Sequence, residues 1–539
     1  MPVFFKKILN NETIIVFSLY LIFLIIGIFS YKDFGVSVDE WETRILGFAN
    51  LKYICDIFFE NIVPQLNLIL KIPELSDYHG THGAIIALPS AYIEYIFGIK
   101  DSQNYFLLRH YLNHLVFLIS NFYFYFLVKE RFSSWKCGIL GAVFMFFTPR
   151  IFAESFYNPK DIIFLSMFII SLYYGINFYK STTIKNAVLF AITTALSIDI
   201  RIMGIIIVPI ITFLTLIKNL KNKKIFLNIS IYISLLIFFT ILFWPYLWSN
   251  PLLNFLKVFK TLGSFGHEGY NFYLGKYHLS SNVPWHYSFV WILITTPILY
   301  IFLFFYGFIN YVSELYKVTN NYFETYNIKV FFTDKSKGED LIYFSLLLLP
   351  LLIVIVLDST LYTGWRHLYF IYPCFLIFSI KGLLLVKKLY FSRWRIVFTS
   401  LISIFIFQIV FTMAKIHPHQ NVYFNFLAGN KVERYFEMDY WGLANKQAFE
   451  YIIKNDVKNI IKIGSGGSIS LENSKAILDY KSRERIIITK NKEADYIIDN
   501  YINWFKYKRK RYEIPANFNI YKEIKVSGNK IISIYKNNN

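Results

Sequence analysis

The sequence predicts an α-helical polytopic membrane protein that ends in a small α/β domain. Three observations predict this class. Of the 539 residues, 55% are hydrophobic, 20% are aromatic and only 17% are charged, whereas soluble globular proteins carry about 25% charged residues. Apolar runs long enough to cross a bilayer recur along most of the chain. From residue 415 onward, shorter helix and strand patterns replace these runs.

The apolar runs predict about eleven transmembrane helices, because a helix needs about 20 mostly apolar residues to cross the hydrocarbon. Some of the runs are short for a crossing. The first run follows two lysines as in a signal peptide, but no small-residue cleavage site follows it, so we expect an uncleaved anchor. The predicted spans are 13–30, 105–128, 134–149, 162–179, 185–198, 202–217, 225–247, 287–312, 341–357, 368–386 and 396–413.

Lysine and arginine in short loops predict the orientation, because they concentrate on the cytoplasmic side. With the N-terminus inside, four cytoplasmic loops are basic, and a fifth, 314–340, mixes both signs of charge. The sequence therefore predicts a multi-pass membrane protein. Its N-terminus is expected in the cytoplasm, and residues 31–104 and the C-terminal part are expected outside.

The two outer segments differ in character. Amphipathic stretches at 41–59 and 83–98 predict helices that lie in the outer membrane interface. Residues 415–539 are predicted to form a soluble α/β domain, and residues 1–414 are predicted to form a transmembrane domain. For the soluble domain we expect a helix at 443–455, strands at 459–464 and 485–490, and a final hairpin around Ser527-Gly528-Asn529.

The net charge of +20 does not predict a nucleic-acid partner, because much of the basic charge is spread over short loops. The basic stretch FKYKRKRY at 505–512 is interpreted either as a solvated loop or as a contact with anionic lipid or substrate. Three widely separated cysteines form no disulfide framework or zinc motif.

Two adjacent carboxylates, Asp39 and Glu40, follow the first span in the stretch YKDFGVSVDEWETR. Ionisable residues at the ends of spans are costly and are therefore candidates for function. Adjacent carboxylates at a membrane surface suit a general base or a site for a divalent cation. The pattern Ser37-x-x-Glu40 is also a capping box that would start the next helix. Both interpretations stay open, since Glu40 can cap while Asp39 projects elsewhere.

A second charged stretch, TPRIFAESFYNPKD at 148–161, lies in the next loop predicted outside. Asn158 before Pro159 is typical of a helix start, with Asp161 in the first turn. Capping does not account for three further charged residues there, which are Arg150, Glu154 and Lys160. Ion pairing among them and a substrate site are the two interpretations.

Arginines and histidines add to this predicted outer site. Arginine offers a rigid fork that suits the phosphate of an anionic head group, although any single one of these side chains could instead extend to the interface. The outer arginines are Arg44, Arg150, Arg201 and Arg366, and His367 adjoins the last of them. His82, in the stretch DYHGTHG, is either a ligand in a loop or an ordinary hydrogen-bonding histidine.

These motifs together resemble those of bacterial GT-C membrane glycosyltransferases of the dolichyl-phosphate-mannose-protein mannosyltransferase type, glycosyltransferase family 39, and their aminoarabinose-transferase relatives. The resemblance covers most of the chain, and NPKD and DYWG are its most specific parts. It rests on the Asp-Glu pair after the first span, on TPRIFAESFYNPKD, on WPYLWSNP at 244–251, on the Arg-His pair at 366–367, on HPHQNVYFN at 417–425 and on DYWG at 439–442.

The resemblance implies a hexosyl- or pentosyltransferase that uses a polyprenyl-phosphate-linked sugar donor. It also implies that the reaction takes place on the extracytoplasmic face of the bacterial inner (cytoplasmic) membrane. By position, Asp39 matches the acid assigned as catalytic base, Asp161 matches an acid that organises the site or a cation, and Arg366 matches a basic residue near the donor phosphate. Where aminoarabinose relatives carry Lys-Pro-Pro, this chain has Thr81-His82-Gly83. That departure leaves the donor sugar undefined.

The expected mechanism has Asp39, with Glu40 beside it and Asp161 nearby, as the catalytic acids. Asp39 takes the acceptor's proton, and the sugar is transferred with inversion to a protein, lipid or glycan. A divalent metal held by Asp39 and Asp161 is an open addition. The predicted substrate-binding residues are Arg150, Glu154, Asn158, Lys160, Arg201, Arg366, His367 and His82. A glycolipid transporter or flippase, and a non-catalytic membrane scaffold, are the alternative functions.

Overall fold

The structure is a computed structural model. It describes residues 11–538 apart from 68, 70, 77–81, 221, 264–268, 327–330, 332–334 and 505–512, and at 389–393 and 395 it describes the backbone alone. The basic stretch 505–512 and the residues His79 and Thr81 therefore lie outside the described residues.

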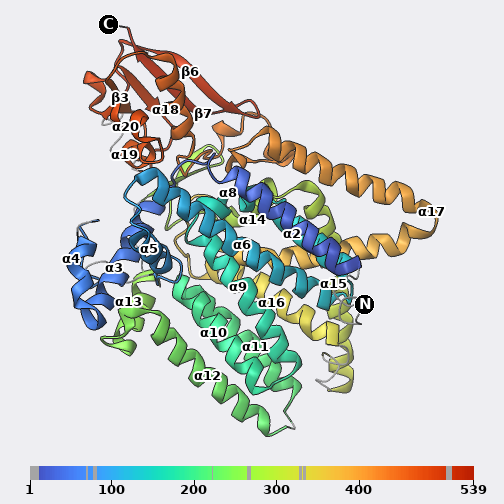
Figure 1. The fold of residues 1–539 in the computed structure, drawn as a ribbon. Helices are drawn as coiled ribbons and strands as arrows, with labels where there is room; N and C mark the ends of the chain where they lie inside the picture. The colour runs from blue at the N-terminus through green and yellow to red at the C-terminus, as the bar shows by residue number, and fades with distance from the viewer. Residues whose placement is uncertain are drawn as a thin grey trace, which may run out of the picture.

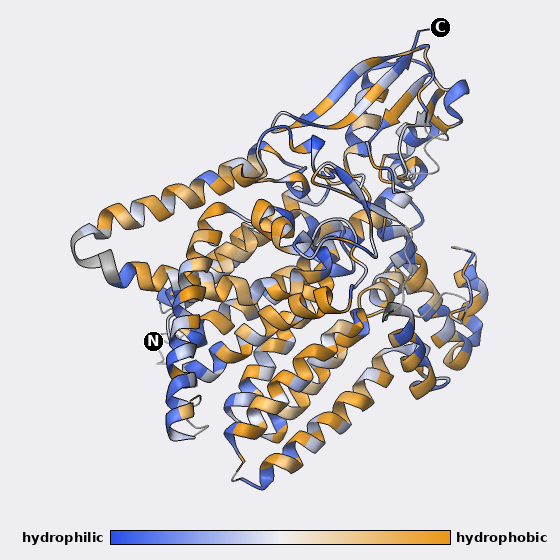
Figure 2. Ribbon diagram, turned by 180° about the vertical axis from the view of Figure 1, so that it is seen from behind, coloured by the Kyte–Doolittle hydropathy of each residue, from blue (hydrophilic) through white to orange (hydrophobic). Residues whose placement is uncertain are grey.

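Long apolar helices form the body of the molecule (Figure 1, Figure 2). Within the described ranges, eight helices are long and apolar enough to cross a membrane, and a ninth crossing is added if the bent pair α7 and α8 is one span. Two of the eight are the arms of α17, which bends at Trp394. The others are α2 (Asn11–Ser30), α6 (Ser102–Arg131), α9 (Asp161–Lys180), α12 (Lys224–Phe243), α15 (Ile298–Thr325) and α16 (Lys335–Val356).

All the predicted spans fall on helices, but the number eleven is not confirmed. Pro149 starts α8 (Pro149–Tyr157), which is bent by 67° from α7 (Trp135–Phe146), so the predicted span 134–149 is broken. Pro297 separates α14 (Tyr287–Thr295) from α15. The predicted spans 185–198 and 202–217 are α10 (Ile184–Ile200) and the 3₁₀ turn η2 (Ile202–Ile206) followed by α11 (Ile207–Lys218), which are short for a crossing.

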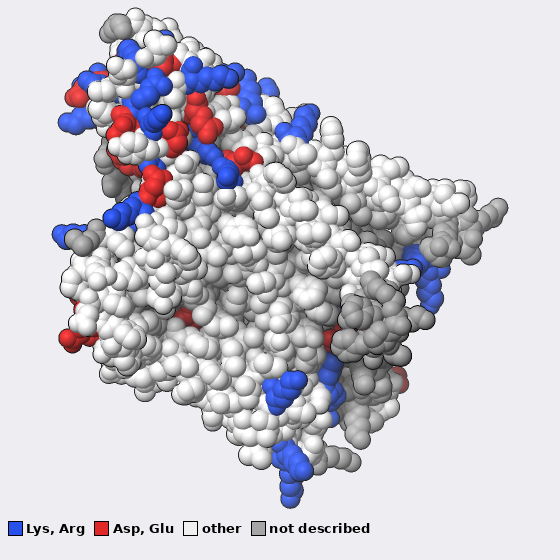
Figure 3. Space-filling model, viewed as in Figure 1, with Lys and Arg blue, Asp and Glu red and all other residues white. Residues whose placement is uncertain are grey.

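The helices divide into a buried centre and a lipid-exposed periphery. In α9 and in residues 366–388, which comprise the 3₁₀ turn η5 (Arg366–Ile371) and the first arm of α17 (Tyr372–Lys415), 78% of the apolar window is buried. In α2 and in residues 396–415 the buried share is 11%. An apolar helix that buries so little of its surface fits contact with lipid. The face of the helical body seen in Figure 3 carries few charged side chains, and they lie near its ends.

The segment after α2 forms a layer of short helices at one end of the bundle. The predicted stretches 41–59 and 83–98 are helical as α3 (Glu40–Phe58) and α5 (Ala87–Ile96). Arg44 does not face the site predicted for the outer arginines: it is ion-paired with buried Glu94, which also binds Arg109 at 2.7 Å. The other elements here are η1 (Glu60–Ile62), α4 (Val63–Asn67), η3 (Pro245–Leu247), α13 (Pro251–Gly263), and the hairpin β1 (Tyr270–Tyr273) and β2 (Lys276–Leu279).

The C-terminal part contains a five-stranded mixed sheet in the order β4-β3-β5-β7-β6. The predicted helix and all four predicted strand positions are confirmed, and Ser527 and Gly528 form the hairpin turn with positive φ. The central strand β5 was not predicted. The elements are α18 (Ala444–Asn455), β3 (Ile461–Ser465), α19 (Leu471–Lys475), α20 (Tyr480–Glu484), β4 (Ile486–Ile488), η9 (Asn491–Glu493), β5 (Tyr496–Asp499), β6 (Phe518–Val526) and β7 (Asn529–Asn537).

A connecting segment, residues 416–443, joins the helices to the sheet. It contains three 3₁₀ turns, η6 (Gln420–Val422), η7 (Phe426–Ala428) and η8 (Val432–Arg434). Its apolar side chains, among them Trp441, belong to one continuous buried cluster that runs from the helices into the sheet. This segment therefore packs as part of the helical body as well as of the C-terminal part.

Candidate functional site

Two carboxylates and three cations form a charged cluster at one end of the helices. It consists of Asp39, Lys160, Asp161, Arg201 and Arg366. Asp39 precedes α3, Asp161 begins α9, Arg201 follows α10 and Arg366 begins η5, so the chain contributes them from four separate places. The sequence analysis predicted each of these five residues for the site, and the fold brings all five together.

Arg366 joins the two carboxylates. Its Nη1 lies 3.0 Å from Oδ2 of Asp39 and 3.6 Å from Oδ2 of Asp161. The guanidinium also lies over the ring of Trp441, 4.5 Å from its centroid, and 5.3 Å from the ring centroid of Tyr362. Two aromatic rings and two carboxylates thus fix the plane of this arginine.

Lys160 and Arg201 pair with one carboxylate each. Nζ of Lys160 is 3.6 Å from Oδ1 of Asp39, and Arg201 donates a hydrogen bond to Oδ1 of Asp161. Three cations therefore face two carboxylates. This leaves an excess of one positive charge, which suits an anionic ligand.

Two histidines border the cluster. Burial is the main cause that holds the pKa of His82 well below its ordinary value, and the charges of Lys160 and Arg201 lower it further. The ring of His367 lies 4.8 Å from that of Tyr362. Four buried nitrogens in and around the cluster have no hydrogen-bond partner among the described residues: Nδ1 of His82, Nε of Arg201, Nε of Arg366 and Nε2 of His367. Buried polar atoms are rarely left unpaired, so these are candidate contacts for a ligand.

Asp39 is held in its ionised form. Burial alone would raise the pKa of its carboxyl, but the nearby charges of Lys160, Arg366 and Arg201 outweigh burial and hold the pKa well below its ordinary value. About a fifth of its side chain, 21%, is exposed, whereas the side chain of Asp161 is fully buried. Asp39 is thus the more accessible of the two carboxylates.

The donor set does not fit a divalent metal ion. Asp39 and Asp161 are both engaged by cations, which would repel a second positive charge. Within the described ranges, no three His, Cys, Asp or Glu side chains are grouped so as to hold a metal. The metal considered for these two acids in the sequence analysis therefore finds no support in the geometry.

Asn158 positions the start of α9. Its Oδ1 accepts from the backbone N–H groups of Lys160, at 3.3 Å, and Asp161, at 2.8 Å, and its Nδ2 donates to Oδ2 of Asp161 at 3.2 Å. These bonds satisfy backbone donors that the first helical turn leaves free. The same amide group donates to Glu154 at 2.8 Å. Asn158 therefore caps the helix and fixes the carboxylate of Asp161.

Arg150 and Glu154 lie one layer behind the charged cluster. Glu154 accepts from the hydroxyls of Tyr369, at 2.7 Å, and Tyr440, at 3.2 Å. Arg150 donates to the carbonyl of Tyr423 at 3.3 Å and places its guanidinium between aromatic rings. Glu154 is joined to the cluster by the amide of Asn158, which donates hydrogen bonds to both Glu154 and Asp161.

Glu40 faces away from Asp39. Its Oε2 accepts from the backbone N–H of Ser37 at 2.7 Å, and its Oε1 lies 2.9 Å from Nε2 of His110. The Ser37 hydroxyl donates to the carbonyl of Tyr157, so only the glutamate half of the capping box forms. Glu40 is buried and fixes the turn that presents Asp39.

Sequence reasoning did not predict the two aromatic residues that contact Arg366, Trp441 and Tyr362. The guanidinium of Arg366 lies over the ring of Trp441, in the DYWG stretch, and over the ring of Tyr362. The DYWG motif was noted only for its resemblance. Asp199 fixes the loop of His82: its backbone carbonyl accepts from Gly83 N–H at 2.7 Å and its Oδ1 from Ile85 N–H at 3.1 Å. A Cβ at Gly83 would lie 2.1 Å from the Asp199 carboxyl, which explains the glycine after His82.

Comparisons with known proteins identify no family for the chain. No family model and no curated protein matches it. Among solved structures, it is similar to an archaeal oligosaccharyltransferase, AglB from Archaeoglobus fulgidus, in complex with an inhibitory peptide and a dolichol-phosphate. The TM-score is 0.46 and the sequence identity 10%, over 89% of this chain and 69% of that one. This TM-score is too low to establish a common fold, so the charged cluster itself must carry any functional proposal.

Proposed function

We propose that this protein is a glycosyltransferase that moves a sugar from a polyprenyl-phosphate donor to an acceptor, with inversion of the anomeric carbon. The charged cluster carries the proposal. It places one accessible carboxylate beside three fixed cations at the end of a bundle of apolar helices. Such a site combines a base, a phosphate-binding group and a lipid environment. The distribution of basic loops in the sequence supports a position of this end of the bundle on the extracytoplasmic face of the membrane.

The cations suit the leaving group. As the bond between the anomeric carbon and the phosphate oxygen breaks, its electron pair stays on the phosphate, and fixed cations stabilise this charge. Arg366 and Arg201 have unpaired Nε–H groups, and Lys160 lies beside Asp39. An arginine whose Nε–H has no other partner can donate two parallel hydrogen bonds to a phosphate, one of them from Nε. The prenyl chain would lie against the apolar helices.

Asp39 is the proposed general base. It takes the proton of the attacking hydroxyl or amine while the acceptor atom bonds to the anomeric carbon, opposite the phosphate. Without substrate, the pairing with Lys160 and Arg366 makes the carboxylate a weak base. A donor phosphate that binds these cations would weaken that pairing and raise the proton affinity of Asp39, since a base works best with a pKa near the working pH.

Asp161 and Glu40 act as positioning residues in this scheme. Asp161 is fully buried and binds Arg201 and Arg366, so it orients the cations that grip the phosphate. Glu40 fixes the turn before α3 through Ser37 and His110. His82 and His367, with their unpaired nitrogens, would contact the phosphate or the sugar.

The test is sugar transfer by the variant Asp39→Asn. Removing general-base assistance lowers rates by about 10²–10⁴-fold, so transfer should fall by at least two orders of magnitude. Lipid-linked sugars and surface glycans of cells with the wild-type or variant protein are compared by mass spectrometry. Asp33→Asn is the matched control, because Asp33 lies in the same segment between α2 and α3 but pairs with His417 outside the charged cluster. Transfer near the wild-type rate in Asp39→Asn would refute the assignment.

The alternative of a glycolipid transporter is less well supported. Transport sites use ionisable groups near the middle of the membrane, at broken helices. Here the charged cluster lies where α9 and η5 begin and α10 ends. Glycolipid flux across vesicles that depends on Asp39, without a new glycosidic bond, would favour the transporter.

A further inference from the structure

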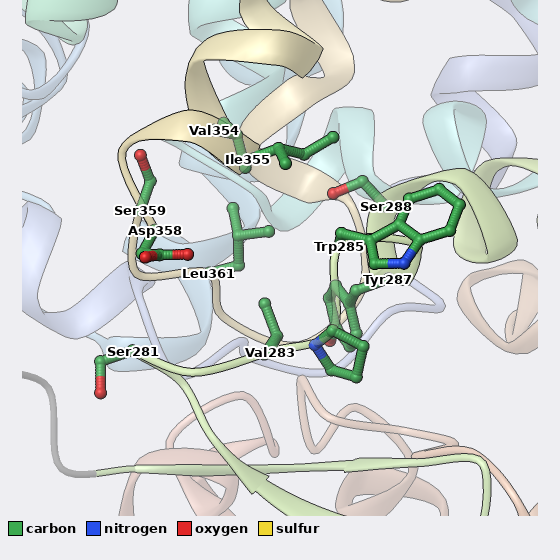
Figure 4. A pocket seen from close by; sticks show the side chains of 11 residues that line it. Ser281, Val283, Trp285, Tyr287, Ser288, Val354, Ile355, Asp358, Ser359 and Leu361 are labelled. Carbon is green, nitrogen blue, oxygen red and sulfur yellow. The ribbon is translucent and has the colours of Figure 1, made fainter.

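A surface cavity lies between the N-terminal end of α14 and the C-terminal end of α16 (Figure 4). Its volume is about 80 Å³ and it is open to solvent. In Figure 4, Asp358 and Ser359 lie on one side and Trp285 and Ser288 on the other. None of the lining residues is a residue of the charged cluster.

The polar groups of this cavity suit a ligand that carries hydroxyl groups. Oγ of Ser288 is buried without a hydrogen-bond partner among the described residues, and the residue is only 5% exposed. Such a hydroxyl is stabilised when a ligand supplies the missing bond. Asp358 adds a carboxylate, which accepts hydrogen bonds, and none of the eleven lining residues is basic. The site therefore suits a neutral polyol better than a phosphate.

Trp285 supplies an apolar face next to these groups. Its side chain is 68% exposed although the indole is large and mostly apolar. Tryptophan is common at membrane–water interfaces, and this preference alone would explain the exposure of Trp285. It would not explain the unpaired hydroxyl of Ser288 and the carboxylate of Asp358 in the same cavity. An aromatic face with a few convergent polar groups is the usual composition of a small-molecule site.

The cavity is linked to the charged cluster through one loop. Tyr287 lines the cavity, and its hydroxyl accepts from Gly364 N–H at 3.1 Å and donates to the carbonyl of Tyr362 at 3.4 Å. The ring of Tyr362 in turn lies beside Arg366. A ligand in the cavity would therefore lie next to the loop that carries the phosphate-binding arginine.

We propose that this cavity is a subsite for a pyranose ring of a carbohydrate acceptor. The ring's apolar face would stack on Trp285, and its hydroxyls would bond to Ser288 and Asp358. The inference rests on the proposed glycosyl transfer and specifies its acceptor class. It makes the acceptor a glycan that extends from the charged cluster past Tyr287, with a second sugar held in the cavity.

Binding is tested without catalysis. The purified full-length protein in nanodiscs is mixed with methyl glycosides of mannose, glucose, galactose and N-acetylglucosamine, and saturation-transfer NMR detects ring protons in contact with the protein. We expect saturation transfer to at least one glycoside, reduced at least about five-fold in Trp285→Ala, which removes the stacking face, and in Asp358→Asn, which removes a charge-assisted hydrogen bond. Trp394→Ala, which removes an exposed tryptophan from the bend of α17, is the control and should not change the signal.

Two further variants make the outcome decisive. Ser288→Ala should weaken glycoside binding without lowering the melting temperature, because it removes a buried hydroxyl that has no protein partner among the described residues. Asp39→Asn should bind the glycoside as the wild type does, which separates the failure of the subsite from the failure of the proposed catalysis. The proposal is overturned if no glycoside gives a signal, if the signal survives in Trp285→Ala and Asp358→Asn, or if ethanolamine and phosphorylcholine bind there and no glycoside does.

Discussion

Arg366 is the residue on which the geometry of the charged cluster depends most. One nitrogen contacts both carboxylates, and the guanidinium plane is held by Trp441 and Tyr362. Because Asp39 and Asp161 share this single cation, a change at Arg366 alters the surroundings of the proposed base and of the proposed phosphate site together. This coupling separates Arg366 from Lys160 and Arg201, each of which pairs with one carboxylate.

The substitution Arg366→Lys tests this role. A lysine keeps the charge but loses the planar fork and the stacking on Trp441. One lost charge-assisted hydrogen bond is worth about 1.5–3 kcal/mol, so we expect transfer to fall by about 10- to 100-fold. Initial rates at several donor concentrations measure the effect, which should appear in KM for the donor as well as in kcat. Arg434→Lys, at an exposed arginine of η8, is the control. Equal rates in Arg366→Lys and wild type would show that the fork is not needed.

Glu437 provides a residue-scale test of pH dependence. Burial raises the pKa of its carboxyl to about 7 from an ordinary value of 4.5, although Thr363 donates a hydrogen bond to it. The folded state therefore prefers the protonated form. Stability is greatest below about pH 4.5 and is lost as the pH rises to about 7, by up to roughly 3 kcal/mol.

We therefore expect Glu437→Gln to raise the melting temperature at pH 8 and to change it little at pH 4.5. A glutamine keeps the hydrogen-bonding shape but cannot ionise. Melting curves of the purified protein across this pH range measure the difference, with Glu472→Gln as an exposed control in α19. An equal gain at both pH values would mean that ionisation of Glu437 is not the cause.

At the scale of elements, the start of α9 combines stability with site geometry. Asn158 caps this helix and also holds the side chain of Asp161. We expect Asn158→Ala to cost about 0.5–2 kcal/mol of stability and also to lower transfer, because Asp161 loses a fixed partner. Ser134→Ala removes a cap from α7, far from the charged cluster, and should lower the melting temperature only. Similar transfer losses in both variants would indicate a general effect of helix fraying.

Elements and site differ in how well the sequence predicts them. Long apolar runs predict helices because burial in lipid requires them, and all the predicted spans are helical. Proline at 149 and 297 breaks two of these runs at places that hydropathy does not register. The cluster acids and cations were predictable because charge is costly at span ends. The role of Trp441 was not predictable, because in the sequence a buried aromatic residue at a binding site looks the same as any residue of the hydrophobic core. Its contact with Arg366 also joins positions that are 75 residues apart in the chain.

The whole molecule joins the helices and the C-terminal part through one core. The sequence predicts separate domains at 1–414 and 415–539, a division that stays a prediction. The connecting segment 416–443 supplies Trp441 to Arg366 and Tyr440 to Glu154, and its core is continuous with both sides. The connecting segment thus contributes contacts to Arg366 and Glu154.

We therefore expect the chain divided after Lys415 to reassemble. Residues 1–415 and 416–539, produced as two polypeptides in the same cell, should copurify and restore transfer, because the buried contacts of the connecting segment remain available to both. Residues 1–415 alone should insert in the membrane, but the rate of sugar transfer should fall at least about 10-fold. Without Trp441, the ion pairs of Arg366 are exposed to water, and ion pairs are weaker in water. Affinity copurification and transfer assays measure both effects. Full transfer by residues 1–415 alone would show that the C-terminal part only adjoins the site, and failure of the two pieces to copurify would mean that the shared core does not hold them together.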